Sequence, residues 1–183
     1  PTGADHCHSL HDTEYAAEGS SLEVIKALGI LEPLSPLDLS PAKVRMSQYF
    51  MNWQHFLNCA HICLIMPFSP SQIAQLVNGA TGWNTSVFEL MKVGERALAL
   101  ARVFNARESY TAKDDIIPER FYEAFNSGPL KDEKIGREAM HQAIQTYYKM
   151  AGWDPERAVP TKEKLQELDL GWVVEELDKT QRR

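Results

Sequence analysis

The sequence lacks a long apolar run, a basic stripe and a cysteine framework, and each absence excludes a class of protein. No apolar segment approaches the ~20 residues that a bilayer-spanning helix needs. The 19 lysines and arginines face 25 acidic residues, and no basic stripe with interleaved aromatic residues is present, so we expect no nucleic-acid partner. Three cysteines are typical of a reducing compartment. The composition therefore predicts a globular cytoplasmic protein.

The chain also lacks an initiator methionine, since it begins at Pro1. The side chains with the most reactive chemistry gather in its first dozen residues and near the end of one helical segment in the middle. We therefore expect a fragment of a longer enzyme, in which upstream domains of the same polypeptide contribute the other part of the site.

Helical periodicity runs between clusters of Gly and Pro, and no convincing strand is present. Ser followed by Pro is a typical helix start, because Ser caps the helix and Pro fits its first turn. The predicted helices cover residues 41–66, 70 to about 79–82, about 87–108, 132–151 and a final short pair after Thr161. The fold class is all-α and multihelical. Residues 1–40 are predicted to continue an upstream helical domain, and residues 41–183 to form a multihelical C-terminal domain.

Cys59 and Cys63 are four residues apart, so on a helix they share one face and could both bind a metal. Packing in the core is the alternative, because Cys is commonly buried. An all-cysteine iron–sulfur site needs four cysteines, so this chain can at most donate a ligand.

A second cluster comprises His6, Cys7, His8 and His11. Its spacing fits no standard zinc module, and a solvated group of loop histidines is the alternative to a zinc site. The pair Asp114-Asp115 has two interpretations as well. It can be a pair of carboxylates for acid–base chemistry, or a loop cap and a salt-bridge partner.

Four segments, taken together, resemble the C-terminal part of the tungsten-containing aldehyde ferredoxin oxidoreductases, over nearly the whole chain. They are residues 58–63, 104–118, 147–154 and 160–161. The family pattern Phe-Asn-x-Arg-Glu-Gly-x-x-Arg-x-Asp-Asp-x-x-Pro corresponds to Phe104 through Pro118. It departs at Ser109, where the family has Gly, and at Ala112, where the family has Arg.

The resemblance implies a set of cofactor ligands. In the family, a segment similar to Asp-Ser-Leu-Gly-x-Cys supplies the last of four cysteines to a [4Fe-4S] cluster, and the other three come from far upstream. Cys63 occupies that position as the metal ligand. The same segment contacts the pterin, which implies that Asn58, Ile62 and Cys63 bind the cofactor. Asn58 replaces an acid with an amide, which has one acceptor oxygen and turns NH2 toward donors.

The segment Gly3-Ala4-Asp5-His6 is similar to the family stretch that carries an active-site histidine close to the tungsten. The resemblance therefore implies a catalytic role for His6. An imidazole with a pKa of about 6.5 can give or take a proton near neutrality.

The resemblance implies a parent enzyme that oxidises a small aldehyde to a carboxylic acid, with water as the oxygen source. Tungsten or molybdenum, held by two pterins, would take the electrons and pass them through the cluster to ferredoxin. The isolated fragment is expected to be inactive and to bind no cofactor. Self-association is left open. The alternatives are a noncatalytic helical interaction domain, the tungsten subunit of a benzoyl-CoA reductase-like enzyme and, more distantly, a zinc-binding domain.

Overall fold

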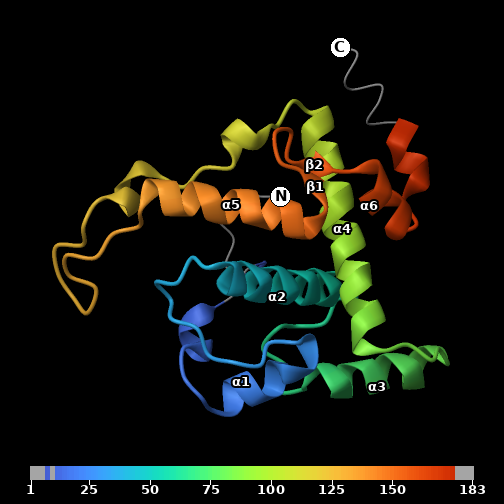
Figure 1. Cartoon of the computed structure of the whole chain (residues 1–183). Coiled ribbons are helices and arrows are strands. Elements are labelled where there is room, and N and C mark those ends of the chain that lie inside the picture. Colours follow the sequence, from blue (N-terminus) through green and yellow to red (C-terminus); the bar gives the residue numbers. More distant parts are fainter. Residues whose placement is uncertain (1–6, 9–10, 176–183) are drawn as a thin grey trace.

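A computed structural model describes residues 7–8 and 11–175 of the chain, and helices dominate the fold (Figure 1). The α-helices are α1 (Ser20–Ile25), α2 (Pro41–Cys59), α3 (Pro70–Thr81), α4 (Val87–Arg107), α5 (Arg137–Ala151) and α6 (Lys162–Glu167). The 3-10 helices are η1 (Asp12–Tyr15), η2 (Lys26–Leu28), η3 (Ala112–Asp114), η4 (Glu119–Tyr122) and η5 (Gly171–Val173). Within the described ranges, no helix has the length and apolarity that a membrane span requires. The all-α fold class is confirmed.

The only paired strands in the described part of the chain form a small hairpin after α5. Strands β1 (Trp153–Asp154) and β2 (Val159–Pro160) pair antiparallel, with Trp153 opposite Pro160. The sequence predicted no strand, because two residues are too few to show the alternation by which a strand is recognised.

The helix starts follow the capping residues. Ser40 accepts a hydrogen bond from the backbone of Lys43 at the start of α2. Ser69 and Ser86 each form a capping box, in which the side chain of the third helical residue bonds back to the cap backbone. The predicted starts of α2, α3 and α4 are therefore confirmed. The start predicted at residue 132 for α5 is wrong, because the chain is still irregular there and α5 begins after Gly136.

Helix α2 ends at Cys59, so the prediction of a helix over residues 41–66 is too long. His61 adopts a left-handed conformation with φ of 56°, and the Ile62 N–H donates to the Leu57 carbonyl at 2.9 Å. This is a Schellman turn, which usually has Gly at the left-handed position. Neither Gly nor Pro stands in the turn after Cys59, so the sequence contains no signal for the end of α2 there.

Helix α4 ends in the same kind of turn. Ser109 has φ of 73°, and the Tyr110 N–H donates to the Asn105 carbonyl at 2.9 Å. Ser109 and His61 both stand where the family patterns have Gly. The backbone therefore keeps the left-handed turn at both positions although the residue that adopts it most easily is absent.

Helix α4 contributes to each of three hydrophobic cores. Leu90 lies in the core formed by α1, η2, α2 and α3. Leu98 packs with Tyr148 of α5 and Trp153 of the hairpin, and Ala99 packs with residues of α6 and η5. In Figure 1, α4 runs past α2, α5 and the hairpin in turn. This one helix thus fixes the positions of the other elements.

The segment before α2 packs against α2. Tyr15, Leu22 and Ile25 are buried in the same core as Met46 and Phe50. The predicted division of a longer polypeptide at residue 40 stays a prediction, but in this chain residues on both sides of it share one core.

Helices α2 and α4 cross in contact at Gly94. A Cβ atom built on Gly94 would lie 1.8 Å from the Asn52 carbonyl oxygen and 2.8 Å from the Phe56 nitrogen. Both atoms belong to the backbone of α2, so no side-chain rotation can relieve the clash. Any side chain larger than hydrogen at residue 94 must push the two helices apart.

We predict that Gly94→Ala lowers the free energy of unfolding by about 3 kcal/mol, at or above the upper end of the usual cost of overpacking, because backbone rather than a side chain must move. Urea denaturation followed by circular dichroism measures the change. Gly79→Ala is the matched control, since nothing lies within 4 Å of its added Cβ in helix α3. The control should gain up to about 1 kcal/mol from helix propensity. Equal effects at residues 79 and 94 would contradict the close crossing.

Candidate functional site

The predicted cofactor-binding segment lies at the C-terminal end of α2. Asn58, Cys59 and Cys63 are exposed, and Ile62 packs partly against the N-terminal core. Both thiols are free, and their exposure rules out the core role considered for them. They do not share a helix face, because Cys63 follows the Schellman turn. This turn folds the chain back against the last turn of α2, so that one local structure presents all four residues.

The N-terminal histidine cluster reaches the same end of α2. The His8 ring stacks on the His55 ring, with centroids 5.0 Å apart and planes inclined by 28°. His55 lies one helical turn before Asn58, so this contact brings the N-terminal segment to the predicted cofactor segment. His6, the predicted catalytic residue, lies outside the described residues.

His55 has a buried nitrogen without a hydrogen-bond partner in the described part of the chain. Its Nδ1 lies 2.8 Å from the Met51 carbonyl oxygen, an acceptor, so Nδ1 carries the proton. Burial lowers the pKa of His55, which favours the neutral ring. Its Nε2 is therefore a buried, unpaired acceptor. Such groups are rare in folded proteins, and this one suits an N–H donor of a bound group.

The described residues around Cys63 do not by themselves form a metal site. Among the residues that the structure describes, no group of three or more His, Cys, Asp or Glu side chains could hold a metal ion. Cys63 offers one exposed thiol, whereas a [4Fe-4S] cluster takes four cysteines. The donor set fits a chain that contributes one ligand to a cluster completed elsewhere.

The two carboxylates of Asp114 and Asp115 have separate structural roles. Asp114 accepts the Thr111 backbone N–H at 2.7 Å and so closes the cap of η3. Asp115 accepts both guanidinium N–H groups of Arg102, at 2.9 and 2.6 Å, and the Tyr148 hydroxyl at 2.5 Å. The loop-cap and salt-bridge interpretation is confirmed, and the acid–base pair is not formed.

Arg102, Asp115 and Tyr148 form a polar cluster, and Arg102 at its centre is only 3% exposed. Its Nε donates to the Ala158 carbonyl at 2.5 Å, and its guanidinium lies 5.1 Å from the Tyr110 ring and 5.5 Å from the Trp153 ring. The cluster therefore joins α4 to the segment after it, to α5 and to the hairpin. Burial, followed by the hydrogen bond to Asp115, raises the pKa of Tyr148, which keeps the hydroxyl protonated as a donor.

Sequence reasoning missed Arg102, Tyr148 and His55. One signal could have indicated Arg102, since it lies four residues after Leu98 and next to Val103, on the apolar face of α4. An arginine at such a position needs a buried acceptor, and Asp115 is the acid of the following motif that provides one.

We predict that Asp115→Ala lowers the free energy of unfolding by about 3 kcal/mol, because it leaves the buried Arg102 guanidinium without its carboxylate. Asp114→Ala is the matched control one residue away. It removes an exposed cap and should cost about 1 kcal/mol. Thermal and urea denaturation of the two variants give the comparison. A larger loss at residue 114 than at residue 115 would show that the buried ion pair is not what holds the segment.

Comparison with known proteins relates the chain to oxidoreductases. A family model described as aldehyde ferredoxin oxidoreductase, domains 2 and 3, matches residues 1–170. The tungsten-containing aldehyde ferredoxin oxidoreductase of Pyrococcus furiosus is 32% identical over 147 residues, which are 78% of this chain and 24% of that protein. The corresponding protein of Thermococcus kodakarensis is 31% identical over the same share. The chain thus spans about a quarter of the length of these relatives.

Two further similarities are more distant. The WOR-like subunit of an aliphatic sulfonate oxidoreductase from Pyrococcus furiosus is 31% identical over 118 residues, covering 61% of this chain and 19% of that subunit. Among solved structures, the active-site complex BamBC of benzoyl coenzyme A reductase, in complex with 1,5-dienoyl-CoA, superposes with a TM-score of 0.61 at 22% identity. It covers 76% of this chain and 21% of the other. This last similarity concerns the fold alone.

Proposed function

The chain belongs to the aldehyde ferredoxin oxidoreductase family, and on that premise we propose that it forms part of the redox centre of an enzyme that oxidises aldehydes to carboxylic acids with ferredoxin as electron acceptor. The observation that carries the proposal is the exposed segment 58–63 at the end of α2, with the Cys63 thiol free and the buried His55 acceptor one turn away. Aldehyde oxidation is the activity in the names of the aldehyde ferredoxin oxidoreductases that cover most of this chain.

In this proposal, four residues of α2 and its turn hold the cofactors. The Cys63 thiolate is one of four ligands to a [4Fe-4S] cluster, and upstream domains of the same polypeptide provide the other three. Asn58, Ile62 and Cys63 contact a tungsten- or molybdenum-bearing pterin, and His55 Nε2 accepts a hydrogen bond from it. When bound, the metal supplies the two-electron chemistry and the cluster carries the electrons onward.

His6 handles a proton in the proposed reaction. An aldehyde and one water become a carboxylic acid with the release of two protons and two electrons, and ferredoxin takes the electrons. The His6 imidazole receives a proton from the hydrated aldehyde as the acid forms, because an imidazole ring can accept and release protons near neutral pH. The stacking of His8 on His55 supports this role, since His8 follows His6 by two positions in the sequence and contacts α2 near the proposed cofactor segment.

The test of the cluster ligand compares two cysteines four residues apart. In the complete polypeptide, reconstituted with iron and sulfide, Cys63→Ser is expected to lose most of the cluster iron, because the replacement removes a thiolate ligand. Iron analysis and the visible absorbance of the cluster measure the loss without any need for activity.

Cys59→Ser is the matched control, since Cys59 is also exposed but has no assigned ligand role. It should keep its iron content. Full iron and absorbance in both variants would remove Cys63 from the cluster and with it the main support for the proposed centre.

The role of His6 has a separate test. His6→Asn keeps a polar side chain but removes the titrating imidazole, so turnover should fall by about 100-fold. Tungsten content, measured on the same preparation, should not change. A wild-type rate in this variant would exclude His6 as the proton-handling group.

A noncatalytic helical interaction domain is the second candidate, and two departures from the family pattern favour it. Asn58 replaces the acid that contacts the pterin, and His61 replaces the Gly of the turn. If the complete wild-type polypeptide takes up neither iron nor tungsten under reconstitution, this candidate replaces the enzyme.

A further inference from the structure

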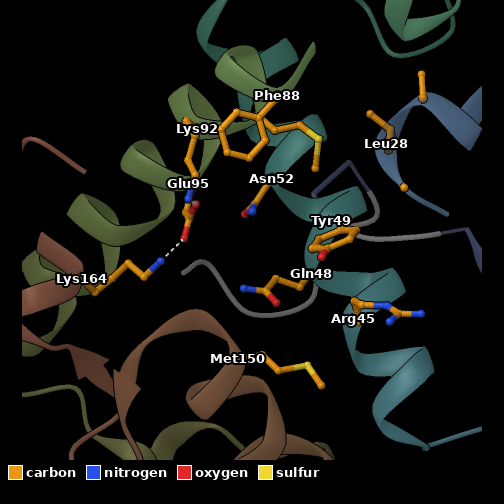
Figure 2. A pocket seen from close by; sticks show the side chains of 13 residues that line it. Leu28, Arg45, Gln48, Tyr49, Asn52, Phe88, Lys92, Glu95, Met150 and Lys164 are labelled. Atoms are coloured by element: carbon orange, nitrogen blue, oxygen red, sulfur yellow. Dashed lines mark hydrogen bonds and ion pairs between the residues drawn. The ribbon is translucent and has the colours of Figure 1, made fainter. Parts of the chain in front are cut away.

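A second site lies away from the predicted cofactor segment, in a cavity of about 510 Å3 between α2 and α4 (Figure 2). The ends of η2, α5 and α6 close its sides through Leu28, Met150 and Lys164. Cavities of this size are typical of small-molecule sites. The roles assigned above to the His6 and Cys63 segments make no use of it.

Two buried carboxamides line the cavity. Gln48 is 7% exposed and Asn52 is 6% exposed, and neither side chain hydrogen-bonds to any residue within the part of the chain that the structure describes. Figure 2 shows both amides directed into the cavity from successive turns of α2. The oxygen and nitrogen atoms of these two amides are not among the fully buried unpaired atoms of the described residues, so they are accessible from the cavity. Two accessible amides aimed at one space can bond to a molecule that enters the cavity.

Lys92, Glu95 and Lys164 line the cavity and belong to an ion-pair network that Glu167, outside the lining, completes. Glu95 accepts from Lys92 at 2.7 Å and from Lys164 at 2.9 Å. Glu167 accepts from the same two lysines, at 2.6 and 2.8 Å. Two ammonium groups therefore face two carboxylates, and the network presents no net charge to a ligand.

The remaining cation, Arg45, does not change this balance near the amides. Figure 2 shows its guanidinium turned away from Gln48 and Asn52, on the other side of Tyr49. Arg45 lines another part of the wall, so the part around the two amides offers hydrogen bonds without an adjacent unpaired charge. A carboxylate ligand would also leave the acceptor oxygens of both amides without donors.

Apolar side chains complete the cavity. Phe88, Met91 and Met150 line it together with Leu28. Phe88 is 66% exposed, so its ring lies at the mouth and can cover a ligand. Methionine side chains adapt to irregular shapes and contact aromatic rings favourably. This wall suits a flat apolar body.

We propose that the cavity binds a neutral small molecule with an apolar, planar body and an amide-like edge, on which an N–H donor lies beside a carbonyl acceptor. Gln48 and Asn52 bind that edge, because a carboxamide provides both an acceptor and donors. Phe88, Met91 and Met150 bind the body. The proposal rests on the cavity alone and is independent of the proposed redox function.

The test uses benzamide and benzoate as a matched pair of probes. The two have nearly the same size, but benzoate is charged and has no N–H donor. In 15N-edited NMR spectra of the 183-residue chain, benzamide is expected to shift the side-chain NH2 signals of Gln48 and Asn52 saturably at millimolar concentration. Benzoate should bind at least five-fold more weakly. Equal binding of the two, or no shift of these signals up to the solubility limit, would overturn the proposal without any variant.

Two substitutions locate the contact. Gln48→Met keeps the length of the side chain and removes the amide, so benzamide should bind about five-fold more weakly, as the loss of one hydrogen bond predicts. Gln75→Met on the exposed face of α3 is the control and should leave the affinity unchanged. Circular dichroism checks that both variants fold. Unchanged affinity in a folded Gln48→Met variant would show that the amide does not recognise the ligand.

Discussion

The contact between the α4 residue Gly94 and the backbone of α2 is the constraint on which the rest of the structure depends. Since no side chain separates the helices there, the axis of α4 is fixed relative to α2. Residues before the crossing then face the N-terminal core, and residues after it face α5, the hairpin and α6. The same crossing lies beside Asn52, so it also sets the depth at which the α2 amides meet the cavity. One glycine therefore determines both the packing of the domain and the shape of a site.

The starts of α2, α3 and α4 could be predicted, because their capping serines act within a few positions, whereas α5 has no side-chain cap to mark its start. The ends and the buried faces could be predicted less well. Near the end of α4, the aromatic residue Phe104 is 55% exposed, whereas the charged residue Arg102 is buried. Hydropathy places the aromatic ring inside and the cation outside. The structure reverses this order because Arg102 meets Asp115 and Tyr148, and these partners come from segments whose proximity no local pattern reveals.

One residue of the candidate site could be predicted from the sequence and another could not. Cys63 could be identified from a motif, because a ligand thiolate has a fixed place in the family pattern. His55 could not, since a single histidine in a helix is usually a surface residue. It is buried, and the contact that covers it is a stacking partner from nearly fifty positions earlier in the chain. The burial of His55 depends on a residue distant in the sequence, so it arises only in the folded protein.

The left-handed turns at His61 and Ser109 share this dependence on the whole fold. A residue with a Cβ atom gains nothing from such a conformation and loses about 1–2 kcal/mol by adopting it. In an isolated peptide, the sequence around residue 61 has no local reason to stop the helix. The stop exists because the surrounding packing selects it, so the loop that carries Cys63 acquires its shape only when the domain folds. The geometry offered to a cofactor is thus a property of tertiary structure, and any loss of packing elsewhere in the domain also loosens the position of the thiol.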